Sequence, residues 1–383
     1  MHSVKKEHGD LFLLSVVIVL LIFGVLMVYS ASSFRGEEKY GDSATFLKSH
    51  VIRVVLGFLC LLIFSRIDYT RLRWVTPLML LMLLGLLVIV LSGQEINGSR
   101  RTFLLFGKRL QPSEFMKLVL IFYIAALFAK GKESPVFQSK NLLVQFAFLL
   151  GVVGLVFIEP DLGTALVLFF IGVAMFYLGG VAWRQLAKLG LFLVPLVSVG
   201  MLIFPYQRQR IMDYWGSLFG TGEMSYQVKQ SVIGLAHGGL LGVGYGGGKQ
   251  KLFFLPEPFS DFILSSVGEE LGFIGIVFLF LLLFIILWRG IRIALRAPDR
   301  YGYLLAGGIT VMILINALMN AGVAINLLPT TGLPFPFLSY GGSSLFTHLI
   351  GVGVLINISR KRVMPYKEYT FAKARNSRWS RAS

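Results

Sequence analysis

Long apolar runs separated by polar segments dominate the chain, and ten of them approach the ~20 residues that a helix needs to cross a bilayer. The runs are Leu11–Tyr29, Val51–Phe64, Val75–Leu91, Phe115–Ala129, Leu143–Ile158, Leu162–Leu178, Leu189–Phe204, Phe262–Leu287, Tyr303–Leu328 and Ser343–Ile358. A membrane β-barrel would instead show alternating segments of ~10 residues. The pattern predicts an all-α polytopic membrane protein with ten transmembrane helices. One integral membrane domain, residues 1–358, precedes a basic tail, residues 359–383.

The composition supports this class of protein. Of the 383 residues, 56% are hydrophobic and 14% are charged, whereas a soluble domain carries about a quarter charged residues. Cys60 is the only cysteine, which excludes an intrachain disulfide and a Cys/His metal cluster. The first run is longer than the signal-peptide core of about 7–15 residues, so we interpret it as an uncleaved helix.

The distribution of cations predicts the orientation of the chain. Ten spans place both termini on one side, and 22 of the 36 Lys and Arg residues fall on that side, against 12 on the other. The positive-inside rule therefore puts both termini in the cytoplasm. A short loop, residues 31–50, and the large loop, residues 205–261, lie outside the cell in this topology. The net charge of +17 is mainly a consequence of this topology. We expect the basic tail of the chain to contact membrane lipid rather than nucleic acid.

The large loop contains the strongest candidate for a functional residue. Asp261 lies at its exit, where the apolar run from Phe262 begins. An acid at that depth is costly unless it is solvated or partnered, which marks a functional site. The alternative is a helix N-cap. The glycine run at 242–248 lacks the Lys-Ser/Thr ending of a P-loop, so we do not expect a nucleotide site.

Four cations in the preceding outside segment have two interpretations. Arg100, Arg101, Lys108 and Arg109 either contact lipid phosphates at the interface or bind an anionic substrate. Arginine suits phosphate because its guanidinium group donates two parallel hydrogen bonds. Composition does not decide between these interpretations.

Two further acids have structural alternatives. Glu114 and Lys117 lie three residues apart on one predicted helix, so an ion pair is the simple explanation. Asp161 follows Pro160 in a short turn, where it either caps the helix from Leu162 or joins a polar site.

The segment 328–344 contains three prolines and three glycines within an apolar context. This composition excludes a continuous helix. Irregular backbone at membrane depth must be buried in protein or line a wet cavity. We therefore expect this segment to wall the same cavity as Asp261.

Eight motifs lie in one order between Ile96 and Ser344: INGSRR, QPSEFMK, EPDLGTAL, SYQVKQS, GGLLGVGYG, KQKLFFLPEPFSDFI, GEELGFIG and LPTTGLPFPFLSYGGSS. Together they resemble the SEDS family, which includes FtsW, RodA and SpoVE. The resemblance implies ten transmembrane helices in a GT-C-like architecture. It also implies a peptidoglycan glycosyltransferase that polymerises lipid II at the outer face of the bacterial cytoplasmic membrane. The GVGVLINISR ending and Gln250-Lys251 are most similar to the division member, FtsW.

The resemblance also implies roles for individual residues. Asp261 falls on the position of the family's catalytic acid, which takes the proton of the acceptor 4-hydroxyl while undecaprenyl diphosphate leaves the donor. Glu257, four residues earlier, either tunes this acid or caps the helix. Cations, or a divalent ion such as Mg²⁺ or Mn²⁺, would stabilise the diphosphate. The candidate substrate-binding residues are Arg100, Arg101, Glu114, Lys117, Asp161, Gln230, Ser231, Lys249, Lys251, Glu257 and Ser339.

The implied partners are the growing glycan strand, a class B penicillin-binding protein that acts as transpeptidase, and other membrane proteins of the divisome at the septum. We expect the transpeptidase helix to dock on the eighth and ninth runs. Gly307, Gly308 and Ala317 on the ninth run are spaced for close helix contact, although packing within this protein explains them equally well. Two alternatives stay open: a RodA-like polymerase of cell elongation and a lipid II flippase. The nearly clean apolar runs favour chemistry at one face over transport.

The sequence departs from the family pattern at three places. Thr102 stands where a Trp commonly follows the Arg pair, His237 replaces a Ser, and Phe259-Ser260 replaces His-Thr before the acid. No role of an imidazole at position 259 carries over.

Overall fold

The computed structural model describes residues 9–92, 101–105, 108–130, 139–191, 195, 198, 203–252 and 254–361. These residues form twelve helices: α1 Leu11–Tyr40, α2 Thr45–Arg66, α3 Tyr69–Leu91, α4 Pro112–Phe128, α5 Ser139–Ile158, α6 Leu162–Gly179, α7 Trp183–Leu191, α9 Pro205–Phe219, α10 Tyr226–Gly238, α11 Ile263–Leu295, α12 Arg300–Ala324 and α13 Gly342–Ser359. A small antiparallel hairpin, β1 Phe103–Leu105 and β2 Lys108–Leu110, pairs Phe103 with Leu110.

Eight helices are long and apolar enough to cross a membrane, namely α1, α2, α3, α5, α6, α11, α12 and α13. Each coincides with a run predicted from the sequence. The fourth run corresponds to α4, which has 17 residues. Most of the seventh run, Leu189–Phe204, lies outside the described residues. The polytopic all-α class is thus confirmed, whereas the count of ten spans stays a prediction.

The first helix is longer than predicted. It continues beyond Tyr29 to Tyr40, and α2 begins at Thr45, so the loop expected over residues 31–50 is wrong. The segment after Tyr29 contains no proline, and its one glycine before Gly41, Gly36, is buried within the helix. This glycine has φ 65° and donates its N–H to the carbonyl of Glu37, which closes the last turn. The end of α1 therefore projects past the apolar run.

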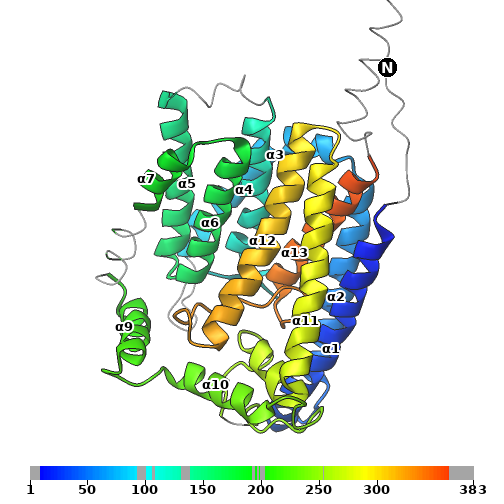
Figure 1. The fold of residues 1–383 in the computed structure, drawn as a ribbon, viewed down its shortest axis with the longest axis vertical. Coiled ribbons are helices and arrows are strands. Elements are labelled where there is room, and N and C mark those ends of the chain that lie inside the picture. Colours follow the sequence, from blue (N-terminus) through cyan, green and yellow to red (C-terminus); the bar gives the residue numbers. More distant parts are fainter. Residues whose placement is uncertain are drawn as a thin grey trace, which may run out of the picture.

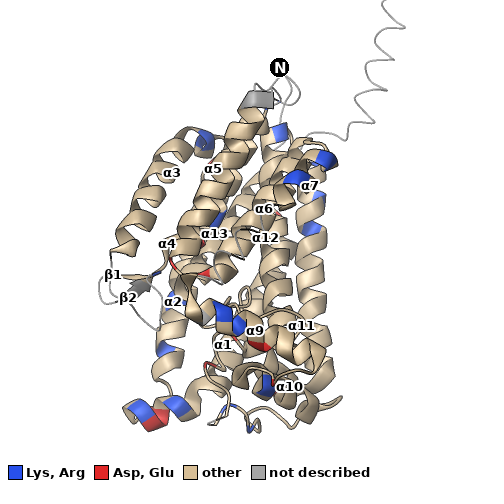
Figure 2. Cartoon of the chain, turned by 90° about the vertical axis from the view of Figure 1, so that its left-hand side faces the viewer, with Lys and Arg blue, Asp and Glu red and all other residues tan. Residues whose placement is uncertain are grey.

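The helices pack side by side, and the two ends of the described chain meet at one end of the bundle (Figure 1). The backbone N–H of Asp10 donates to Oγ of Ser359 over 3.0 Å. Helix α13 packs against α2, and α12 packs against α11, α6 and α4. Figure 2 shows Lys and Arg mainly at the two ends of the bundle, as expected for helices that cross a bilayer.

The segment 205–261 gathers at the opposite end of the bundle, below the spans in Figure 1. It is partly helical, with α9 and α10 joined by turns. Which side of the membrane this end occupies stays a prediction from the cation distribution.

The glycine-rich loop docks into a break in α11. Gly272 has φ 65° and ψ −164°, so the helical ladder is interrupted there. The loop forms hydrogen bonds with the backbone groups that the break exposes. The N–H groups of Val243 and Gly244 donate to the carbonyls of Glu269 and Glu270. The N–H groups of Phe273 and Ile274 donate to the carbonyls of Gly239 and Leu240, and all four distances lie between 2.9 and 3.2 Å. A Cβ atom at Gly242 would lie 2.2 Å from the carbonyl oxygen of Glu270. The glycines therefore permit close backbone contact with α11.

Two of the three small residues of α12, Gly308 and Ala317, pack inside the bundle. A Cβ atom at Gly308 would lie 2.4 Å from Met175 and 2.7 Å from Ile121, so this position faces α6 and α4. Ala317 is buried. Gly308 and Ala317 therefore serve packing within the bundle, and the docking face expected on the eighth and ninth runs stays a prediction.

Candidate active site

Asp261 lies in the turn before α11, but it does not cap that helix. Phe262 occupies the N-cap position, and no side chain makes a capping hydrogen bond. The Asp261 carboxylate instead accepts a hydrogen bond from Oγ of Ser260 over 3.0 Å. Its backbone carbonyl accepts one from Nδ2 of Asn320 over 2.7 Å. The capping alternative is thus excluded, and the backbone of the acid is fixed from α12.

A narrow pocket surrounds the carboxylate and brings five segments together. It is lined by Arg210, Gln227, Asp261, Asn320 and the segment 330–333. Gly332, with φ 67°, forms the closest wall: a Cβ atom there would lie 3.4 Å from Oδ2 of Asp261 and 3.8 Å from Nη1 of Arg101. Glycine therefore keeps open the space between the acid and the guanidinium group.

The surrounding charges act on Asp261 in opposite directions. Burial raises the pKa of the Asp261 carboxyl above its ordinary value, whereas Arg101 and, more weakly, Arg210 lower it. The nearby carboxylate of Asp161 raises it again. An acid with a raised pKa is a better proton acceptor at neutral pH than an ordinary aspartate.

Asp161 has both of the roles considered from the sequence. Its Oδ1 accepts from the backbone N–H of Thr164 over 3.1 Å, which caps α6. Its Oδ2 accepts from Nε2 of Gln111 over 2.7 Å and lies 3.8 Å from Nη1 of Arg101. The cap therefore also positions Arg101 beside the pocket.

Glu159 is a site residue that the sequence analysis did not select. Its side chain is fully buried, and within the described part of the chain neither carboxylate oxygen has a hydrogen-bond partner. Burial, and then the charge of Asp161, raise its pKa to about 9, although Arg101 acts against this. The acid is neutral at pH 7. The only signal in the sequence was the pair of acids around Pro160.

The irregular segment 328–344 walls the pocket, as predicted. Oγ of Ser339 donates to the carbonyl of Ser260 over 2.6 Å and accepts from the N–H of Phe335 over 2.8 Å. The N–H of Tyr340 donates to the carbonyl of Phe259 over 2.9 Å. These bonds join the segment to the turn that carries Asp261.

Phe259, which stands where the family has His, belongs to an aromatic cluster. Its ring centroid lies 4.8 Å from that of Phe46 and 5.4 Å from that of Tyr340. The guanidinium group of Arg53 lies 4.1 Å from the Tyr340 ring centroid. The substitution is thus accommodated by packing against α2.

A cavity of about 1070 Å³ adjoins this cluster and reaches Ser260, the neighbour of Asp261. One part of its lining is polar and mostly cationic, and another part is apolar. The lining residues are Arg35, Lys39, Tyr40, Phe46, Ser49, Ile52, Arg53, Leu56, Leu110, Phe115, Glu257, Phe259, Ser260, Tyr340, Gly342, Ser343 and Phe346. Such a cavity suits a ligand with an anionic head and an apolar chain.

Glu114 and Lys117 form a buried ion pair away from the pocket. Nζ of Lys117 lies 2.8 Å from Oε1 of Glu114 and donates to Oδ1 of Asn316 over 3.1 Å. Both charged side chains are nearly inaccessible to solvent. The ion pair predicted from their spacing is confirmed.

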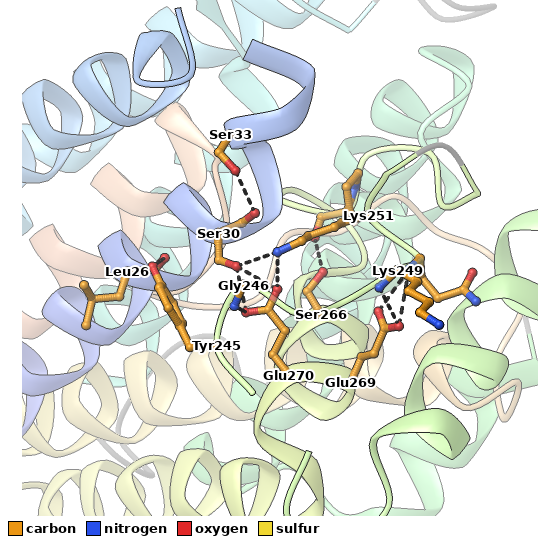
Figure 3. A network of polar contacts seen from close by, with 12 residues as sticks. Leu26, Ser30, Ser33, Tyr245, Gly246, Lys249, Lys251, Ser266, Glu269 and Glu270 are labelled. Carbon is orange, nitrogen blue, oxygen red and sulfur yellow. Dashed lines mark hydrogen bonds and ion pairs between the residues drawn. The ribbon is translucent and has the colours of Figure 1, made fainter. Parts of the chain in front are cut away.

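Lys251 belongs to a buried network around the break in α11 (Figure 3). Its Nζ lies 2.7 Å from Oε1 of Glu270 and 2.9 Å from Oγ of Ser30. Glu270 also accepts from the N–H of Gly246. The neighbouring Glu269 accepts from the N–H of Lys249 over 2.9 Å, while the Lys249 side chain is exposed. This network joins α1 and the loop to α11.

The remaining candidates are spread over the same end of the bundle. Oγ of Ser231 donates to the carbonyl of Ala324 over 2.7 Å, and Gln230 is half-buried on α10. Glu257 pairs with Arg35 at 3.3 Å on the rim of the cavity. Arg100 lies outside the described residues. None of these contacts tests a role in substrate binding.

Among the described residues, no group of three or more His, Cys, Asp or Glu side chains is placed to hold a metal ion. The described side chains near Asp261 therefore do not make a metal site by themselves, and binding of Mg²⁺ or Mn²⁺ stays a prediction. The cations that lower the pKa of the acid are the guanidinium groups of Arg101 and Arg210.

Comparison with known proteins identifies the family. The cell cycle protein family of FtsW, RodA and SpoVE matches residues 10–364. The chain belongs to this family. Relatives of this FtsW/RodA/SpoVE chain include the "Probable peptidoglycan glycosyltransferase FtsW" of Trichlorobacter lovleyi, 39% identical over 93% of this chain and 94% of the relative. The stage V sporulation protein E of Bacillus subtilis is 38% identical over 94% of this chain and 99% of its own length.

Solved structures of the FtsW/RodA/SpoVE family have the same fold. A chain from a peptidoglycan synthase complex that coordinates polymerization and crosslinking superposes with a TM-score of 0.75 and 28% identity, covering 93% of this chain and 99% of its own. RodA of Thermus thermophilus superposes with a TM-score of 0.69 and 27% sequence identity. This match covers 93% of this chain and 98% of the RodA chain. The RodA-like fold is therefore confirmed for this chain.

Proposed function

We propose that this protein is a peptidoglycan glycosyltransferase that polymerises lipid II at the outer face of the cytoplasmic membrane, with Asp261 as the general base. The observation that carries the proposal is the carboxylate of Asp261. It lies between Arg101, Arg210 and Gly332, next to a cavity with a cationic part and an apolar part.

In the proposed reaction, the 4-hydroxyl oxygen of the acceptor GlcNAc attacks the anomeric carbon of the donor MurNAc. The bond from that carbon to the diphosphate oxygen breaks, and undecaprenyl diphosphate leaves with the electron pair. The hydroxyl proton passes to the Asp261 carboxylate. General-base assistance of this kind contributes roughly 10²–10⁴-fold.

The developing charge on the diphosphate needs positive partners. Arg101 and Arg210 lie close enough to act on Asp261, and Arg35, Lys39 and Arg53 line the adjacent cavity. Guanidinium groups bind phosphate through paired hydrogen bonds. We propose no step through a metal bound by the protein alone. A divalent ion such as Mg²⁺ or Mn²⁺ would enter the site bound to the diphosphate of the substrate.

We further propose a role in septal wall synthesis, with a class B penicillin-binding protein as crosslinking partner. The named relatives favour FtsW, and the structural neighbour belongs to a synthase complex that joins polymerization to crosslinking. The cation distribution supports a multi-pass bacterial protein with both termini in the cytoplasm.

Purified protein in liposomes with lipid II tests the activity directly. We expect glycan polymer from the wild type and a loss of at least about 10²-fold from Asp261→Asn, since an amide accepts no proton at neutral pH. Glu223→Gln is the matched control, because Glu223 is an 87% exposed acid on the same loop. Its activity should equal that of the wild type.

The same assay separates the proposal from its alternatives. A lipid flippase would translocate lipid II and form no glycosidic bond. Polymer from Asp261→Asn at the wild-type rate would contradict the assignment of the base. Complementation of a division mutant or an elongation mutant distinguishes the FtsW-like role from the RodA-like role.

A further inference from the structure

Helix α9 has an apolar face that no described part of the protein covers. Met212, Trp215 and Phe219 are 53%, 51% and 70% exposed. Their spacing of three and four residues places them on one side of the helix. The rings of Trp215 and Phe219 stack, with centroids 5.5 Å apart and planes at 8°. An exposed apolar patch of this kind marks a contact surface.

A second face of α9 is fixed to the connection between α12 and α13. Nη1 of Arg210 donates to the carbonyl of Thr330 over 3.0 Å, and the hydroxyl of Tyr214 donates to the carbonyl of Leu327 over 2.8 Å. Ile211 and Gln207 are buried on this side. The apolar face therefore points away from the bundle, beside the ends of α6 and α12 in Figure 1.

Two contacts set the height of α9 along the bundle. Phe204, its N-cap residue, lies 6.0 Å from Phe157 between ring centroids, at the last turn of α5. Leu327 follows the end of α12 at Ala324. The helix thus lies where membrane-spanning helices end, which is the level of the lipid headgroups.

The apolar face of α9 also continues the surface that the spans present to lipid. An open apolar groove of about 620 Å³ runs along α6 and α12, with Phe170, Tyr177, Ile315 and Leu318 in its lining, and reaches Leu327. Leu327 is 63% exposed, and its carbonyl accepts the hydrogen bond from the hydroxyl of Tyr214. Trp and Tyr are enriched at this level in membrane proteins.

We propose that α9 is an interfacial helix whose Met212–Trp215–Phe219 face is embedded in the headgroup region of the bilayer, at the end of the bundle that holds Asp261. Amphipathic helices bind this region through their apolar face. The helix carries Arg210, which lines the Asp261 pocket. Lipid therefore supports one wall of the site.

The test uses single labelled cysteines in a Cys60→Ser background. Met212→Cys and Asp213→Cys place an environment-sensitive fluorophore on adjacent residues, about 100° apart around the same helix. Position 212 is apolar and exposed, and position 213 is polar and half-buried. The protein is reconstituted in phosphatidylcholine–phosphatidylglycerol vesicles with or without brominated acyl chains. We expect several-fold stronger quenching by brominated lipid at 212 than at 213, and the reverse order for aqueous iodide.

A second measurement does not depend on labelling. Brominated lipid should quench a component of the intrinsic fluorescence that disappears in Trp215→Phe. Equal iodide quenching at 212 and 213, with no lipid quenching at 212, would overturn the proposal. It would also be overturned if 212 became shielded from iodide only on addition of a transpeptidase, since the face would then be a protein interface. Neither result depends on polymerase activity, so failure of the proposed function is recognised separately.

Discussion

Nζ of Lys251 lies 2.7 Å from Oε1 of Glu270, and both side chains are shielded from solvent. Since a buried charge without its partner costs about 3–5 kcal/mol, Lys251→Met should strongly lower the thermal unfolding temperature in detergent. The double variant Lys251→Met/Glu270→Gln removes both charges and should recover much of the loss. If Lys251→Met alone unfolds like the wild type, the pair does not stabilise the loop against α1.

Removing the guanidinium group of Arg101 should change the pH dependence of activity. The base form of Asp261 exists above its pKa, which burial raises and Arg101 lowers. The acid limb of kcat/KM should therefore lie above the ordinary aspartate pKa of about 3.9, and Arg101→Gln should move it to still higher pH. Arg66→Gln, an exposed cation at the opposite end of the bundle, is the control and should leave the limb in place.

Gly332→Ala should inactivate the enzyme by more than its effect on stability explains. A left-handed backbone conformation costs a non-glycine residue roughly 1–2 kcal/mol, and the new methyl group would lie 3.4 Å from the Asp261 carboxylate. Gly41→Ala provides the control, because Gly41 has a similar φ of 65° and nothing within 4 Å of its Cβ position. Both variants should lose similar stability, and only Gly332→Ala should lose polymerisation. Equal polymerisation rates for Gly332→Ala and Gly41→Ala would show that catalysis does not need the space beside Asp261.

Glu159→Gln should stabilise the protein increasingly as the pH rises. The unfolded state releases the proton of Glu159 near pH 4.5, whereas the folded state keeps it up to about pH 9. A raised pKa means that the stability contribution is complete below pH 4.5 and is lost progressively up to about pH 9. Glutamine has no proton to release, so the difference in unfolding temperature from the wild type should grow between pH 5 and pH 9. A constant difference would indicate that Glu159 is ionised in the folded protein.

Local sequence patterns predicted the parts of the site whose partners are close in the chain. The spacing of Glu114 and Lys117 was sufficient for their ion pair, and the position of Asp161 was sufficient for its cap on α6. The prolines and glycines of 328–344 likewise predicted irregular backbone near Asp261. In each case the physical cause acts within one helical turn or one loop.

Contacts between distant segments could not be predicted in this way. Arg210 bonds to Thr330, 120 residues later, and Ser30 bonds to Glu270 across 240 residues. Nothing in the local pattern distinguished the paired Lys251 from the exposed Lys249. The length of α1 was also missed, because its polar last turns carry no apolar signal and include Gly36, although the helix continues to Tyr40.

One amide group on α12 has a mechanical consequence for the whole site. Nδ2 of Asn320 donates to the carbonyl of Asp261 and to that of Leu333, each over 2.7 Å. The acid and the wall opposite it are therefore carried by the same turn of one helix. A tilt of α12 in a thicker or thinner bilayer moves both together, so the gap that receives the reacting hydroxyl keeps its width while the surrounding helices adjust.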